Sequence, residues 1–537
     1  MRPVLALFVC TLACIALAQQ GADFIVIADD DYADAIQPLV EWRHASGIRT
    51  KLALTSQIGS DSASVRNYIR NAWLNWPVKP AFVLLIASPS EIRAIRYGNR
   101  WRYYSDNYYA DLEGDVKAEV AVGRFPCRSA SEAELMVAKT LYYEREPYVE
   151  DSTWMLRLTT VVREGGDSDD TIYWNNSRNL ARLAGEHGFI SCDSLSGYRG
   201  HHSGHVISSI DSGTAFVLYR GTAGGWWRDP FNVNPYNTSN GRKLPIVFSM
   251  TCETMSLDPY DVLLGQYFMF AGTVENPAGC VAFYGNTVSG MSVARQRGAA
   301  ARGIASGLFE DELHRMGLVV LRSKLQLITE FPYDDEDYRG LSLFGDPCLP
   351  VWYGRPQVLA VDHPLEILVE SLDVTVTVTH NGEAVENAVV CASMDTVVYS
   401  VDTTDAYGEA TLPVAPADTG FIRLVVTGRN LVPYDGGIHV VTQVAVRERF
   451  PAMPTRARMV ARPSVVSRAC TFVWDSPGAA VLEIRDPLGR TLRSIDVSGK
   501  RSVTWESSGS MPAGVYYCRL ADAADRTLGT CRVLRAD

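Results

Sequence analysis

Short apolar runs recur along residues 19–354, and most of them are apolar at nearly every position rather than at every second one. A continuously apolar run of this length is typical of a strand that is covered on both faces of a sheet. The pattern predicts strands at residues 24–28, 50–54, 81–87, 118–125, 156–162, 215–221, 244–250 and 279–285.

Between these runs, apolar residues return at helical spacing. Residues 62–75 and 129–146 each begin with serine, a helix-capping residue, and residues 34–47 end on a glycine that suits a helix C-terminus. Strand and helix therefore alternate, which predicts an α/β domain with a mostly parallel sheet flanked by helices. The region is long enough for two subdomains, 19–150 and 151–354, with a break near residues 144–152.

The pattern changes after residue 354, where short alternating strands are separated by turn residues such as Asn-Gly. This texture predicts a β-sandwich over residues 355–447. A segment rich in proline and arginine, 448–464, reads as a linker. Residues 465–537 return to short strands and predict a second, smaller β-sandwich.

The first residues have the pattern of a secretory signal peptide. Arg2 supplies a positive charge, Val4 to Ala18 is apolar but too short to span a bilayer, and Ala16-Leu17-Ala18 fits a cleavage site. We therefore assign 1–18 to a cleaved signal and expect a soluble protein that is secreted or held at the cell surface.

Composition and charge narrow the class of partner. The chain is 47% hydrophobic and 21% charged, which is ordinary for globular domains, and its formal net charge is −11. An acidic chain lacks the basic footprint that nucleic acid or an anionic membrane surface requires. Nine of the eleven cysteines lie beyond the signal, so at least one thiol stays unpaired in an oxidising compartment.

Candidate chemistry gathers where predicted strands end. Cys252 follows the strand 244–250, the loop 221–227 follows the strand 215–221, and Glu164 and Asp167 follow the strand 156–162. Ligands bind at the carboxyl ends of strands in open α/β sheets, so neighbouring parallel strands would bring these loops to one edge. A thiol, a polar loop and carboxylates at one edge suit a cysteine hydrolase, with backbone N–H groups near Cys252 and Ala223 as the oxyanion hole. The alternative for Cys252 is a small buried apolar side chain.

Several stretches resemble, in their residues and in their order along the chain, the gingipain-type cysteine peptidases, which have a caspase-like α/β fold. The stretches are "SDNYYADLEGD" (105–115), "VGRFP" (122–126), "SGTAFVLYRG" (212–221), "LPIVFSMTCETMS" (244–256), "NPAGCVAFYG" (276–285) and "LFGDPCLPVW" (343–352). They span the whole α/β region. The module after it resembles the Ig-like domain that follows the peptidase in that family. The last module resembles Ig-like modules that close many exported bacterial proteins, some of them sorting signals of the type IX secretion system.

The resemblance implies an exported endopeptidase that acts on protein or peptide substrates and needs no cofactor for catalysis. It assigns the nucleophile to Cys252 and an acidic catalytic residue to Glu164. The family histidine of a Gly-His-Gly loop falls on Thr222, which is the main departure from the family pattern. Threonine cannot protonate a leaving amine at neutral pH, and the loss of a positioned acid–base group costs roughly a factor of 10² to 10⁴ in rate.

A histidine-rich loop offers a substitute base. His201, His202 and His205 follow a probable strand at 189–195, so we expect them at the same edge as Cys252. The alternative is a solvated polar loop or a weak surface metal cluster.

Two further sites have a functional and a structural interpretation. Trp226 and Trp227 would wall a substrate cleft, or else pack in the core. Asp106, Asp111 and Asp115 would bind calcium, as related enzymes do, or else cap turns.

Three functions follow from these residues. The first is an active cysteine endopeptidase. The second is a pseudo-peptidase, disarmed at Thr222, that serves as a binding or assembly module at the cell surface. The third is an adhesin whose Ig-like modules carry the function, with the C-terminal module as a candidate attachment.

Overall fold

The computed structural model describes residues 21–98, 102–290, 293–395, 397–442, 459–462, 464–466, 469–475, 478–486, 490–506 and 512–535. The predicted signal 1–18 and most of the predicted linker 448–464 lie outside the described residues. The chain divides into two compact units, 1–444 and 445–537.

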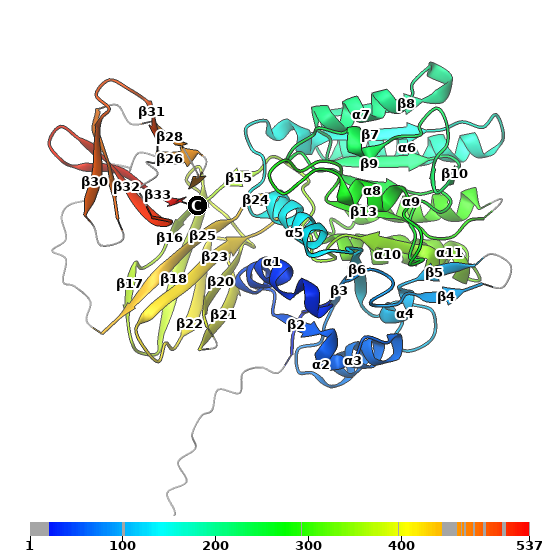
Figure 1. Ribbon diagram of the computed structural model, residues 1–537, viewed down its shortest axis with the longest axis horizontal. Helices are drawn as coiled ribbons and strands as arrows, with labels where there is room; N and C mark the ends of the chain where they lie inside the picture. Colours follow the sequence, from blue (N-terminus) through cyan, green and yellow to red (C-terminus); the bar gives the residue numbers. More distant parts are fainter. Residues whose placement is uncertain are drawn as a thin grey trace, which may run out of the picture. The chain divides into compact units, whose positions relative to one another are not determined.

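A ten-stranded sheet runs through the first unit (Figure 1). Its spatial order is β2 (Thr50–Leu54), β1 (Phe24–Ala28), β3 (Phe82–Ile86), β6 (Ala121–Phe125), β14 (Leu341–Phe344), β13 (Ala282–Asn286), β12 (Ile246–Ser249), β9 (Phe216–Arg220), β7 (Arg157–Val162) and β8 (Ser191–Ser196). Every neighbouring pair is parallel except β13 with β14. The sheet therefore consists of two parallel blocks that run in opposite directions and meet at β14.

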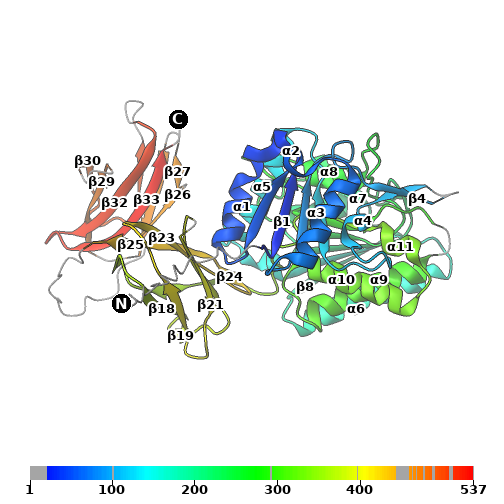
Figure 2. The ribbon, with the colours of Figure 1, turned by 90° about the horizontal axis from the view of Figure 1, so that it is seen from below.

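Helices cover both faces of this sheet (Figure 2). On one face, α1 (Ala33–Ala45), α5 (Ala130–Glu144), α7 (Ser203–Ser212) and α8 (Leu264–Phe270) share an apolar core with residues of β1, β9 and β12. On the other face lie α3 (Ser62–Asn75), α6 (Asp169–Glu186), α9 (Ala294–Phe309) and α10 (Met316–Glu330). Three shorter helices are α2 (Thr55–Ile58), α4 (Asn107–Ala110) and α11 (Asp335–Gly340). The predicted mostly parallel α/β fold is confirmed.

Local sequence explains how the helices begin. The Asp61 carboxylate accepts the backbone N–H groups of Ala63 and Ser64 at the start of α3, and Ser129 does the same for Glu132 at the start of α5. Both strands of a two-stranded hairpin, β4 (Ile95–Tyr97) and β5 (Tyr103–Ser105), precede α4.

Residues 357–441 form a β-sandwich with one apolar core. One sheet contains β16 (Ala360–Asp362), β18 (Leu372–His380), β19 (Glu383–Ala384) and β22 (Glu409–Val414); the other contains β17 (Glu366–Leu368), β25 (Tyr434–Val441), β23 (Gly420–Thr427), β20 (Val389–Met394) and β21 (Val398–Thr403). A short pair, β15 (Gln357–Val358) and β24 (Leu431–Val432), lies beside them. The sandwich packs on α1, where Trp42 and Ala45 meet Val425.

The second unit is also all-β. Its sheets are β26 (Met459–Arg462), β28 (Ala469–Trp474) and β31 (Ser502–Glu506), and β27 (Val465–Val466), β33 (Thr527–Arg535), β32 (Gly514–Asp522), β29 (Ala479–Arg485) and β30 (Thr491–Asp496). They close over one apolar core.

Candidate active site

The loops singled out in the sequence leave one edge of the sheet. β12, β9, β7 and β8 are consecutive parallel neighbours. Their carboxyl ends therefore carry Cys252, the loop after residue 220, Glu164 and the histidine loop at the same edge, as the sequence predicts.

Cys252 lies two residues beyond Met250, whose backbone N–H joins the end of β12 to β9. The Met250 N–H donates to the Tyr219 carbonyl (3.2 Å), and the Thr251 hydroxyl donates to the Gly221 carbonyl (2.6 Å). The Cys252 side chain is half-buried, and its thiol donates to the Gly290 carbonyl (3.3 Å). The thiol is thus held at a fixed point of the edge, with part of its surface open to solvent.

A buried arginine, Arg220, stabilises the turn between β12 and Cys252. Arg220, at the end of β9, is 1% exposed, and its guanidinium donates to the Met250 carbonyl, the Asn176 side chain (3.0 Å) and the Ala294 carbonyl (2.8 Å). Its guanidinium also lies 4.9 Å from the centre of the Tyr173 ring. Burial lowers the pKa of Arg220 to about 10, which still leaves the side chain charged at neutral pH.

The loop after β9 is a tight hairpin formed by β10 (Ala223–Gly224) and β11 (Trp226–Trp227). Thr222 is exposed, and its carbonyl accepts the Tyr219 hydroxyl (2.8 Å) and the Arg228 N–H (3.3 Å). The bond from the Arg228 N–H to the Thr222 carbonyl makes residues 222 and 228 a hydrogen-bonded pair. The next pair, Ala223 and Trp227, is therefore a non-hydrogen-bonded pair, because the two kinds of pair alternate along an antiparallel ladder. The Ala223 N–H therefore points away from its partner strand.

The two tryptophans of this hairpin have different surroundings. Trp227 is 1% exposed, stacks on Tyr219 with 4.4 Å between ring centres, and donates to the Ser249 hydroxyl (2.9 Å). The expectation that Trp227 walls a cleft is corrected, because its ring and its N–H are both used inside the core. Trp226 is half-buried and borders a hollow of about 470 Å³ with Asn232, Val233, Asn234 and Tyr267.

Glu164 is directed toward the end of β8. Its carboxylate accepts the Ser196 hydroxyl (2.5 Å) and the Gly197 N–H (3.0 Å), and the residue is 9% exposed. Asp170 organises the same loop by accepting the N–H groups of Gly165 and Gly166 (2.7 and 2.9 Å). In this structure Glu164 thus joins β7 to β8, and its described partners are Ser196 and Gly197 rather than a histidine.

The three loop histidines contact one another and their own backbone. His201 accepts the Ser196 N–H (3.0 Å), His202 accepts the Gly204 N–H (3.1 Å), and His205 accepts the His202 N–H (3.2 Å). The last two bonds cap the start of α7. β8 is the third strand from β12, which corresponds to about 14 Å at the usual strand spacing. The loop shares the predicted edge, but its described bonds are those of a helix cap.

A buried ion pair that the sequence did not reveal lies beside Cys252. Arg297 of α9 donates to Asp337 of α11 through Nε and Nη2 (3.1 and 3.0 Å) and to the Val288 carbonyl through Nη2 (3.1 Å). Asn286 also donates to Asp337 (2.6 Å). No spacing in the sequence points to this group, because its members belong to a strand and two separate helices.

A second hollow, of about 370 Å³, is lined in part by Glu253, the residue after Cys252. Glu253, Asp258 and Asp261 contribute carboxylates to it, and Arg96 and Arg102 contribute cations. Burial, and then the charge of Asp261, raises the pKa of Glu253. The hollow thus offers charged groups of both signs next to Cys252.

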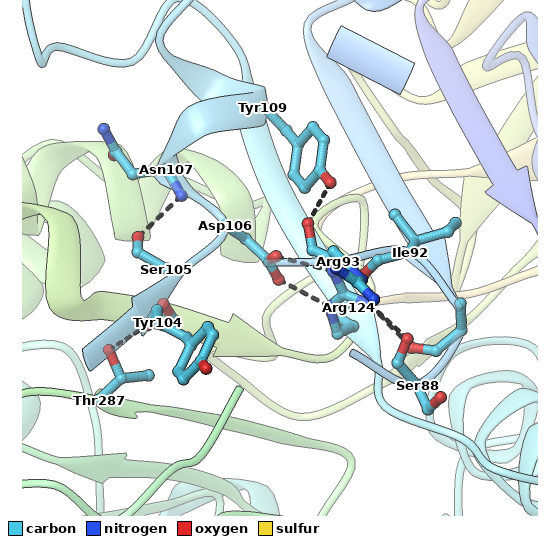
Figure 3. Close-up of polar contacts among 12 residues, drawn as sticks. Ser88, Ile92, Arg93, Tyr104, Ser105, Asp106, Asn107, Tyr109, Arg124 and Thr287 are labelled. Carbon is cyan, nitrogen blue, oxygen red and sulfur yellow. Dashed lines mark hydrogen bonds and ion pairs between the residues drawn. The ribbon is translucent and has the colours of Figure 1, made fainter. Parts of the chain in front are cut away.

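The carboxylates expected to bind calcium each have a protein partner. Asp106 forms a two-pronged ion pair with the buried Arg124 (both 2.7 Å; Figure 3), Asp111 accepts the N–H groups of Gly114, Asp115 and Val116, and Asp115 pairs with Lys117. Within the described residues, no group of three or more His, Cys, Asp or Glu side chains is arranged to hold a metal ion. These contacts give no support to a calcium site.

Comparison with known proteins places the fold. Over most of its length the structure superposes on the crystal structure of the Arg-specific cysteine proteinase gingipain R, with a TM-score of 0.71, 20% identity and coverage of 79% of this chain and 98% of that chain. It matches the complex of the pro- and mature domains of the Porphyromonas gingivalis enzyme with a TM-score of 0.70 and 20% identity, over 78% of this chain and 100% of that chain.

Among curated proteins, the chain is 24% identical to Gingipain R1 of Porphyromonas gingivalis over 68% of its own length, and 24% identical to Gingipain R2 over 94%. These matches span 37% of that Gingipain R1 and 66% of that Gingipain R2. The family model for peptidase family C25 matches residues 17–352. The chain therefore belongs to peptidase family C25.

Proposed function

We propose that this chain is an exported cysteine endopeptidase that hydrolyses peptide bonds through the Cys252 thiolate. The observation that carries the proposal is the position of Cys252, half-buried at the carboxyl end of β12 and tied to the neighbouring loops by Met250 and Thr251. This is the edge at which α/β sheets bind their ligands.

The hairpin beside Cys252 supports acyl transfer. The Ala223 N–H points away from its ladder, and together with the Cys252 N–H it would donate to the oxyanion that forms when sulfur attacks a carbonyl carbon. Removal of one such donor typically lowers kcat by a factor of about 10² to 10³.

The two hollows are candidates for substrate binding. Trp226 and Tyr267 present aromatic surface in one, which suits an apolar side chain of a peptide. Glu253, Asp258 and Asp261 line the other and favour a cationic side chain, although Arg96 and Arg102 balance part of their charge.

The test is cleavage of a denatured protein by the purified full chain, beside Cys252→Ala. A matched control is Cys192→Ala, since Cys192 is also half-buried but lies in β8. Activity that disappears in Cys252→Ala and persists in Cys192→Ala is the expected result. Equal cleavage by the parent chain and Cys252→Ala would contradict the proposal.

A disarmed peptidase that serves as a binding module is the second candidate, and Thr222 favours it. Thr222 is exposed at the position that the family resemblance gives to histidine. Thr222→His separates the candidates. An inactive parent chain that gains roughly 100-fold or more in cleavage with Thr222→His would indicate a scaffold that lacks only its acid–base group.

The predicted signal peptide and the C-terminal module support a site of action outside the cell. We place it outside the cell, with residues 465–537 as a candidate for surface attachment. Within the described ranges, no helix has the length and apolar character needed to cross a membrane.

A further inference from the structure

The guanidinium of Arg297 and the thiol of Cys252 converge on the same segment of backbone. The Val288 carbonyl accepts both Arg297 Nη2 (3.1 Å) and the N–H of Glu253, the residue after Cys252 (2.9 Å). Two residues further on, the Gly290 carbonyl accepts the Cys252 thiol (3.3 Å), and a Cβ placed on Gly290 would lie 3.3 Å from Arg297 Nη2. The segment 288–290 therefore holds cation and sulfur side by side.

The cation is permanent and fixed in place. Arg297 is 3% exposed, and Asp337, itself 2% exposed, holds it through two bonds to one oxygen. Burial acts to lower the pKa of Arg297, but Asp337 and the Cys252 sulfur outweigh it, the sulfur both as a charge and as a hydrogen-bond partner, so the pKa is raised. A guanidinium does not lose its proton at neutral pH.

Other charged and titratable groups face this pair from every neighbouring element. The Cys252 sulfur lies close enough to Tyr173 and Tyr219 to affect both electrostatically, Arg297 affects Arg220, and it also affects two acidic residues near α11. Among the described residues, this group includes Tyr173 of α6, Tyr219 and Arg220 of β9, Glu253, Asp334, and Glu336 and Asp337 of α11. Arg220 adds positive charge on the sheet side, together with Arg163, which acts on Tyr219, and Arg297 approaches the sulfur from the helix side.

We propose that Arg297 is the cation that holds the Cys252 sulfur as a thiolate, so that activation of the nucleophile in this chain does not depend on a histidine. A neighbouring positive charge is the usual means of stabilising a cysteine thiolate. Arg297 would act beside the reacting atom, because the segment 288–290 holds both side chains. The proposal rests on the proposed function only where the thiolate is used for acyl transfer.

In this proposal Arg297 stabilises the thiolate but does not donate a proton, and this has a consequence for the reaction. The thiolate attacks the carbonyl carbon, so that a C–S bond forms and the C–N bond breaks, and the leaving amine takes its proton from a water molecule, which becomes hydroxide. That hydroxide then forms a C–O bond with the acyl carbon as the C–S bond breaks, which restores the thiolate and releases the acid. Because Arg297 cannot supply the proton, added imidazole would accelerate peptide cleavage without changing the reactivity of the thiol.

The experiment is alkylation of the full chain with iodoacetamide from about pH 6 to about pH 8, followed by mass spectrometry of the peptide that contains Cys252. When the pH is lowered from about 8 to about 6, the alkylation rate of an ordinary thiol, with a pKa near 8.5, falls roughly 100-fold. We expect the alkylation rate of Cys252 to fall less than about threefold in the parent chain, and Arg297→Met to restore the steep pH dependence.

Two variants serve as controls. Arg297→Lys retains the positive charge and is expected to keep a shallow profile. Arg302→Met removes a half-exposed arginine of the same helix, which pairs with Glu330, and is expected to change nothing. If Arg297→Met does not fold, the profile of the parent chain still decides.

The two proposals fail separately. A steep profile in the parent chain, or a shallow profile in folded Arg297→Met, would overturn the role of Arg297 even if peptide cleavage is observed. A shallow profile with no peptide cleavage, with or without imidazole, would overturn the proposed peptidase and leave the role of Arg297 intact.

Discussion

At the level of single residues, two buried arginines differ in the groups that compensate their positive charge. Arg297 has the carboxylate of Asp337, whereas Arg220 has neutral acceptors just after β12 and on α6 and α9, and no carboxylate pairs with it among the described residues. The carbonyl of Met250 is one of these acceptors, so Arg220 supports the turn that presents Cys252. Its loss would leave buried acceptors without donors.

Arg220→Met tests this support. We expect the free energy of unfolding to fall by about 3–5 kcal/mol, because three buried acceptors lose a charged donor. Arg182→Met is the matched control, since the Arg182–Glu186 pair on α6 is exposed and such a pair contributes about 0.5 kcal/mol or less. Denaturant unfolding monitored by fluorescence measures both variants, and equal midpoints would contradict the role of Arg220.

Asp334 provides a pH test beside the Arg297 pair. Burial, and then the charge of Asp337, raises its pKa from 3.8 to about 6. The folded state then binds more protons than the unfolded state between these values, so stability falls as the pH rises from about 4 to about 6. Asp334→Asn keeps an acceptor for the Asp337 N–H and removes this dependence.

Asp334→Asn is expected to stabilise the protein at neutral pH by roughly 1 kcal/mol, after discounting for the partial exposure of the side chain, and to have little effect near pH 4. Thermal unfolding at the two pH values measures the difference. Asp335→Asn, at the next position, is the control. A gain that is equal at both pH values would show that the charge of Asp334 is not its cause.

The histidine loop shows how an element can account for residues that look catalytic. His202 and His205 close the first turn of α7, and His201 holds the end of β8. All three use a ring nitrogen as an acceptor from backbone N–H groups. Histidine at these positions thus serves the strand-to-helix connection, in the same way that Ser and Asp cap α5 and α3.

His202→Ala is therefore expected to act on stability. It removes the acceptor of the Gly204 N–H and should cost about 1 kcal/mol, the usual value of a helix cap. The alkylation rate of Cys252 and any peptide cleavage should be unchanged in folded His201→Ala, His202→Ala and His205→Ala. A loss of cleavage of about 100-fold in one of them, with normal stability, would restore the histidine as the base.

The sequence predicts those elements whose signal is local. Apolar runs located β1, β2, β3, β6, β7, β9, β12 and β13, and the strand-end rule placed Cys252 beside the loop after β9. It did not locate β14, a short strand followed at once by "GDP", or the antiparallel junction that β14 makes with β13. The ion pair between Arg297 and Asp337 was not predicted, because it depends on how α9 and α11 pack, and no residue spacing along the chain indicates that packing.

At the scale of the molecule, the first unit is unified by buried charge as well as by its sheet. Arg43 of α1 pairs with Asp346, which follows β14, and with Glu144 of α5. Next to it, Trp42 packs against Val425 of the sandwich, and Arg145 pairs with Asp435. The sandwich is therefore bound to the peptidase-like domain by apolar and ionic contacts, and both fold within one unit.

The second unit has three cysteines in its core, and two of them face each other. Cys518 of β32 and Cys531 of β33 are in direct register, and Cys470 shares the core. The hydrogen bond between the two thiols raises the pKa of Cys518 and lowers that of Cys531. Directly opposed residues of antiparallel strands have Cα atoms about 4.5–5.5 Å apart, which is within the range of a disulfide.

We therefore expect Cys518 and Cys531 to lose two hydrogens and form a disulfide when the protein is exposed to oxidised glutathione. A closed loop of about 15 residues stabilises a fold by roughly 3 kcal/mol, so reductant should lower the unfolding midpoint of residues 445–537 and leave that of the first unit unchanged. Peptide mapping without reductant, and unfolding with and without it, measure both effects. Cys470→Ser should behave like the parent chain, whereas Cys518→Ala should abolish the response. A cross-link through Cys470 instead would mean that the register of β32 and β33 does not decide which thiols pair.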